Sequence, residues 1–152
     1  MTYEDLLIEA EHNQLIVKEL PLPVSKGRIK GNWIAIRTDM NEVEKKCILA
    51  EELGHYYTST GNILDQRDVQ NQKQEYKARL WGYNKLIGLN SIVQAYQKGC
   101  QSQYEIANFL QVSELYLKEV ITCYTKKYGI CKDFKGYRIF FEPYLYVEEK
   151  SD

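Results

Sequence analysis

One segment of the 152-residue sequence combines carboxylates and an imidazole at a spacing that suits metal chemistry. Glu51 and His55 are four residues apart, so on a helix their side chains lie on one face and could hold a divalent ion. Glu52 follows Glu51 directly, where its carboxylate could accept a proton from a water activated by that ion. These residue types at this spacing suit metal-assisted hydrolysis. The spacing alone, however, fits better a solvated acidic face that ends in a histidine, because Glu-Glu-x-x-His occurs in many surface helices.

The helix that must position this segment is predicted over about 41–58. Its apolar residues recur at helical spacing: Val43, Cys47, Ala50, Leu53 and Gly54. Burial makes such a helix an unfavourable place for unpaired carboxylates. A second helix is predicted over about 71–88, and Glu75 adds another carboxylate there.

The remaining pattern predicts an α+β fold with a mainly helical core and a small N-terminal β-sheet. Its elements are expected at 3–13 (helix), 15–20 and 32–38 (strands), 60–70 (loop), 91–129 (three shorter helices) and 136–147 (terminal β structure broken at Pro143).

The charge, hydropathy and cysteine content of the chain argue against several classes of function. The formal net charge is −1 and no basic stripe stands out, so phosphate neutralisation gives no support for nucleic-acid binding. No apolar run is long enough for a membrane span, and the acidic N-terminus lacks the layout of a signal peptide. The four cysteines form no Cys-x-x-Cys pair and are expected to be reduced thiols. We therefore expect a cytoplasmic protein without a membrane partner.

The segment 49–57, Leu-Ala-Glu-Glu-Leu-Gly-His-Tyr-Tyr, resembles the active-site helix of ImmA/IrrE-type metallopeptidases from phages and mobile elements. The segment 75–81, Glu-Tyr-Lys-Ala-Arg-Leu-Trp, resembles the next helix of that family. The resemblance also covers the N-terminal helix and strands and the stretch 105–128. It implies a zincin-like core over 1–90, a helical region resembling a helix-turn-helix over 91–130 and a C-terminal β segment over 131–152.

The resemblance also implies roles for individual residues. Glu51, His55 and Glu75 would be metal ligands, and Glu52 would be the general base. Zinc is the metal expected, and the partner would be a helix-turn-helix repressor whose cleavage releases the genes of the mobile element. The protein would thus be an anti-repressor.

Other titratable residues are weaker candidates for the metal site. Asp65 and Asp68 are alternative third ligands, but aspartates in loops more often form turns and caps. His12 ends the first predicted helix and is expected to be exposed.

One departure from the motif H-E-x-x-H bears on the chemistry, because Glu51 occupies the place of the first histidine. Two glutamates and one histidine make a harder, oxygen-rich site that tolerates manganese better and lowers the Lewis acidity of its ion. Two outcomes follow from this exchange: a peptidase with altered metal preference, or a degenerate peptidase without metal that regulates its partner by binding.

Residues 104–117 have the outline of a helix-turn-helix, with Ser113 as the cap of the second helix. The start of that helix offers Glu114, Tyr116, Lys118 and Glu119, and carboxylates there repel phosphate. We expect this unit to pack or to dock a partner, and a regulator that binds DNA is the less favoured alternative.

Overall fold

The computed structural model describes residues 1–59 and 68–151, with the backbone alone for 68–71. Two compact units, Met1–Lys85 and Leu86–Asp152, make up the chain. The predicted α+β class is confirmed. The three-part division at residues 90 and 130 stays a prediction. Among the described helices, none has the length and apolar content to cross a membrane.

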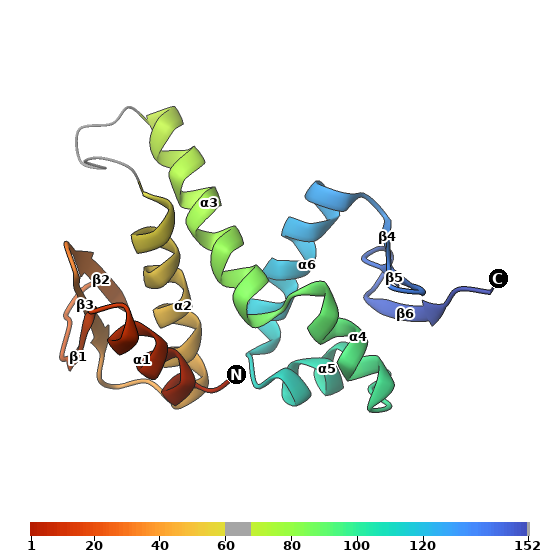
Figure 1. Ribbon diagram of the computed structural model, residues 1–152, viewed down its shortest axis with the longest axis horizontal. Helices are drawn as coiled ribbons and strands as arrows, with labels where there is room; N and C mark the ends of the chain where they lie inside the picture. The colour runs from red at the N-terminus through yellow and green to blue at the C-terminus, as the bar shows by residue number, and fades with distance from the viewer. Residues whose placement is uncertain (60–67, 152) are drawn as a thin grey trace. The chain divides into compact units, whose positions relative to one another are not determined.

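The first unit combines a three-stranded sheet with three helices (Figure 1). Its elements are α1 (Tyr3–His12), β1 (Ile16–Leu20), β2 (Gly27–Lys30), β3 (Trp33–Arg37), α2 (Glu42–Thr58) and α3 (Asp68–Leu86). The strand order is β1-β3-β2, with β1 parallel and β2 antiparallel to the central β3. Both β1 and β2 are therefore edge strands of this sheet.

Alternation along β3 decides which face of the sheet is buried. Ile34 and Ile36 are 1% and 0% exposed, whereas Trp33, the first residue of β3, is 52% exposed. Because successive side chains of a strand point to opposite faces, α1 and α2 cover the isoleucine face. Among residues 1–59 and 68–85, no helix lies against the tryptophan face.

Small residues let α2 and α3 approach closely. A Cβ atom built on Gly54 would collide with the carbonyl oxygen of Ala78, and one built on Gly82 would lie 3.2 Å from the carbonyl oxygen of Ala50. The two contacts are one turn apart on each helix. The helices therefore touch backbone to backbone along this seam, immediately beside His55.

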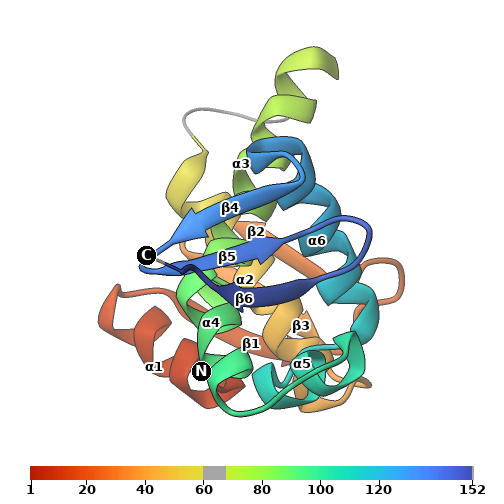
Figure 2. The ribbon, with the colours of Figure 1, turned by 90° about the vertical axis from the view of Figure 1, so that its right-hand side faces the viewer.

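The second unit packs helices against an antiparallel sheet. Its elements are α4 (Leu89–Gln97), α5 (Gln103–Leu110), α6 (Glu114–Tyr128), β4 (Cys131–Phe134), β5 (Tyr137–Phe140) and β6 (Tyr146–Glu149). Figure 2 shows the three strands of this sheet in the order β4-β5-β6. The core includes Tyr124, which is fully buried and donates a hydrogen bond from its hydroxyl to the Ile87 carbonyl over 2.8 Å.

Three sequence expectations need correction. Residues 68–70 are helical and begin α3, although their polar composition predicted a loop. Strand β2 was not predicted because Ser25-Lys26-Gly27 is a turn signal, yet pairing with β3 extends the backbone from Gly27 onward. Strand β4 was not predicted either, because the terminal β structure was expected to begin only at residue 136. It forms because β5 supplies its hydrogen-bond partners.

The contact between α2 and α3 predicts an unusual effect of alanine. Gly54→Ala should destabilise the protein by about 1–3 kcal/mol through overpacking, although alanine has the higher helix propensity by about 1 kcal/mol. Gly82→Ala is the matched control and should cost less, because a displacement of a few tenths of an ångström relieves its contact. Urea unfolding of both variants measures this. Equal or greater stability of Gly54→Ala would show that the two helices are not in contact there.

Candidate metal centre

The side chains of the predicted centre come from α2 and α3. Asn41 caps α2 by accepting a hydrogen bond from the Glu44 backbone N–H, which fixes where the helix begins. Glu51 and His55 then lie one turn apart on the same side of α2. Glu75, on α3, comes within 3.5 Å of the His55 Nε2 atom through its Oε1.

Glu51, His55 and Glu75 form a group with the composition of a metal site. Each offers one ligand atom, and the three atoms lie within 4.8 Å of one another. Two ligands of a tetrahedral zinc ion at about 2.1 Å would be about 3.4 Å apart, close to the separation of His55 and Glu75. The partly exposed Glu51 supplies the third ligand atom of the group.

The imidazole of His55 also fits a metal ligand. Its side chain is 11% exposed, and within the described residues its Nδ1 atom is buried without a hydrogen-bond partner. Its Nε2 atom faces Glu75 and is the nitrogen placed to ligate an ion. One imidazole nitrogen and two carboxylate oxygens therefore form a donor set that fits a divalent cation.

Glu52 lies on a different side of α2 from the ligand group and faces β2. A Cβ atom on Gly27 would lie 2.6 Å from the Ile48 Cγ2 atom and 3.2 Å from the Glu52 Oε1 atom, so the glycine leaves room for both side chains of α2. Burial first, and then the nearby carboxylates of Glu51 and Glu75, together raise the pKa of Glu52 to about 7. A carboxyl group that titrates near neutral pH can both accept and donate a proton there.

The charge of the site is strongly negative. Three carboxylates (Glu51, Glu52 and Glu75) cluster around His55, and Arg79 places its Nε atom 3.7 Å from Glu51 Oε1. Arg79 is more than half exposed, so water screens this pair and makes it weak. A divalent cation would neutralise the two ligand carboxylates, and Arg79 would compete with it for Glu51.

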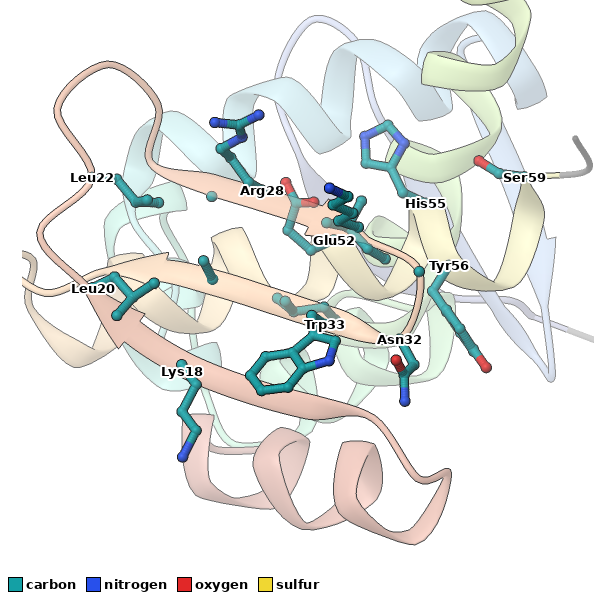
Figure 3. A pocket seen from close by; sticks show the side chains of 16 residues that line it. Lys18, Leu20, Leu22, Arg28, Asn32, Trp33, Glu52, His55, Tyr56 and Ser59 are labelled. Carbon is teal, nitrogen blue, oxygen red and sulfur yellow. The ribbon is translucent and has the colours of Figure 1, made fainter. Parts of the chain in front are cut away.

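An open groove leads from these residues along the sheet (Figure 3). Glu52, His55, Tyr56 and Ser59 of the α2 side line it together with residues of all three strands. Strand β2 forms its rim, because β2 pairs with β3 on one side only. An edge strand of this kind offers unpaired backbone groups to an extended peptide.

The structure separates the other candidates from the centre. His12 is the exposed last residue of α1 and is not part of the ligand group. Asp65 lies outside the described residues, and Asp68 is the first residue of α3, of which only the backbone is described. Sequence reasoning missed Arg79 and Gly27, because only the pairing of helices and strands reveals their contacts with Glu51 and Glu52.

The helix-turn-helix outline corresponds to α5 and α6. Ser113 caps α6 by accepting a hydrogen bond from the Tyr116 backbone N–H, as predicted. Gln111 adopts a left-handed conformation with φ of 57° at the turn between the helices. Glu114, Lys118 and Glu119 are exposed on α6. The preference for docking over DNA binding stays a prediction.

The raised pKa of Glu52 predicts how the stability of the metal-free protein depends on pH. The unfolded carboxyl titrates near 4.5 and the folded one near 7, so the folded state holds more protons between these values. The free energy of unfolding is greatest below pH 4.5, the unfolded pKa, and it declines as pH rises through the folded pKa of about 7. The decline should be about 2–3 kcal/mol between pH 5 and 8.

Chemical unfolding at several pH values in the presence of a chelator measures this decline. Glu52→Gln should flatten it and should be the more stable form at pH 8. Glu44→Gln, an exposed glutamate of the same helix, should retain the full decline. A decline of equal size in Glu52→Gln would assign it to another group.

Comparison with known proteins identifies the family of the chain. The model of the M78 peptidase family, described as an IrrE N-terminal-like domain, matches residues 4–122. This match covers both helices of the centre and the sheet beside it, and it extends into α6. None of the curated proteins matches the chain. Because the family model covers most of the sequence, the chain belongs to the M78 peptidase family of the ImmA/IrrE type.

Proposed function

We propose that this protein is a metal-dependent endopeptidase that cleaves a helix-turn-helix repressor and thereby acts as an anti-repressor of a phage or mobile element. One observation carries the peptidase part: Glu51, His55 and Glu75 converge from two helices while Glu52 is buried beside them at the end of a groove. The repressor as partner rests on the resemblance to ImmA/IrrE-type proteins.

The residues divide the work of peptide hydrolysis. Glu51, His55 and Glu75 would hold the metal, zinc by preference, with manganese favoured more than usual by the two oxygen donors. When bound, the metal supplies Lewis acidity toward the peptide carbonyl and the attacking water. Glu52 takes a proton from that water and returns it to the leaving amine. The unpaired edge of β2 orients the peptide beside Glu52.

A second function, regulation by binding alone, is favoured by one specific observation. Arg79 lies 3.7 Å from Glu51, so a cation of the protein itself already faces one ligand of the centre. With glutamate in place of the usual histidine, this pair could maintain the fold of the helix without a metal. The protein would then antagonise its partner by contact.

Metal content distinguishes these functions. Protein purified without chelator or affinity metal should contain about one ion per chain, as in a mononuclear site, by elemental mass spectrometry. His55→Ala should lose the ion, whereas His12→Ala, which removes the other histidine of the chain, should keep it. Glu51→His should bind zinc more tightly. An ion absent from the native protein but present in Glu51→His would favour regulation by binding.

Cleavage of a repressor tests the catalytic role. Incubation with the helix-turn-helix repressor encoded beside the protein should give a specific cut, seen by intact mass spectrometry. Glu52→Gln should slow the cut by about 100-fold or more, the usual contribution of a general base, and should still bind the repressor and the metal. Glu42→Gln, an exposed glutamate of α2, is the control and should cut normally. Undiminished cutting by Glu52→Gln would remove Glu52 from the mechanism.

A further inference from the structure

The register of the N-terminal sheet places basic and large apolar side chains together on one face. Lys18 of β1 and Arg28 of β2 both pair with Ala35 of β3, so they flank it in one row across the sheet. The next row places Lys30 beside Trp33, because directly paired residues share a face. We call this the outer face, defined by Lys18, Leu20, Arg28, Lys30 and Trp33.

Within the described residues of its own unit, no helix covers the outer face. α1 and α2 lie against the opposite face, where Ile34 and Ile36 are buried. Trp33 is 52% and Leu20 45% exposed, which is far more than such side chains usually are in a sheet. Figure 3 shows Lys18, Leu20 and Trp33 projecting from this face, with the strands between them and α2.

The charge of the outer face is positive although the net charge of the chain is −1. Lys18, Arg28 and Lys30 are exposed, and within residues 1–59 and 68–151 they form no ion pair. Arg37, farther along β3, pairs with Asp39 over 2.8 Å. Three unpaired cations around an exposed tryptophan and leucine are complementary to acidic groups beside a large apolar side chain.

The outer face is continuous with the candidate metal centre. Lys18, Arg28 and Trp33 line the same groove as Glu52 and His55, so its lining includes side chains on both sides of the sheet, whose free edge beside the groove is β2. A polypeptide whose scissile bond lies at Glu52 could therefore extend over that edge onto the outer face. Its distant residues would meet the three cations and not the catalytic groups.

We propose that the outer face is a docking site for an acidic peptide segment that carries a large apolar residue, belonging to the protein substrate but remote from the bond that is cut. The substrate relation rests on the proposed function. A polypeptide fits better than single-stranded nucleic acid, because Leu20 offers aliphatic surface and Trp33 is the one aromatic side chain of the face. Stacking of successive bases needs more than one aromatic platform.

Peptide selection on the full chain tests the specificity of this face. A display library of random 12-residue peptides is selected against Glu52→Gln, which prevents turnover, and against the same chain with Lys18→Glu and Arg28→Glu. Peptides enriched on the first protein should be rich in Asp and Glu with a Trp, Phe or Leu. The charge-reversed protein should instead enrich Lys and Arg, whereas Lys126→Glu, an exposed lysine of α6, should select like the parent.

The best acidic peptide is then measured by fluorescence anisotropy. Its affinity should fall about tenfold or more in the double charge reversal and also fall in Trp33→Ala, and it should weaken with salt. Equal affinity in these variants, or preferential binding of a 12-residue oligothymidylate, would overturn the proposal.

Metal content and cleavage of a short peptide are measured on the same variants, without the Glu52 change. These readouts separate the docking proposal from the proposed function. Normal metal content and cleavage with unchanged peptide selection would refute docking alone. Charge-dependent selection in a protein that binds no metal would support docking and refute the peptidase.

Discussion

The candidate centre depends on the close contact between α2 and α3. Gly54 touches the backbone of Ala78, and Gly82 lies against the backbone of Ala50. The two helices therefore meet at these points without side chains between them. Interhelical distances normally depend on the side chains at the contact, and glycine gives the shortest. Only this approach brings Glu75 of α3 to within 3.5 Å of His55. The packing of the small residues therefore sets the geometry of the ligands.

Electrostatics makes this packed site costly without a counterion. Three carboxylates surround one imidazole, and the weakly held Arg79 is the nearby cation that the structure describes at Glu51. Burial and mutual repulsion raise the pKa of Glu52 to about 7, which is also the range in which a carboxyl group can exchange protons during hydrolysis. The same negative charge attracts a divalent ion. Stability and chemistry are thus linked through one cluster of charges.

The sheet contributes differently on its two faces. The isoleucine face supports α2 and so fixes Glu52 against β2, where Gly27 leaves space for the carboxylate. The outer face presents cations and a tryptophan, and the free edge of β2 joins the two. A small sheet with one buried face can therefore both support a helix and bind an extended polypeptide.

The sequence by itself determined the helix of Glu51, Glu52 and His55, the strands β1 and β3 and the cap at Ser113, because these rest on local spacing and periodicity. The family was indicated separately, by the resemblance of segments 49–57 and 75–81 to known family helices. Local patterns do not record which backbones approach one another. The tertiary structure alone placed Arg79 at Glu51, Gly27 at Glu52 and Gly54 at Ala78, and it extended β2 through pairing despite its turn-like start. It also gathered Lys18, Arg28 and Trp33 on one face, since strand register joins residues that the sequence separates.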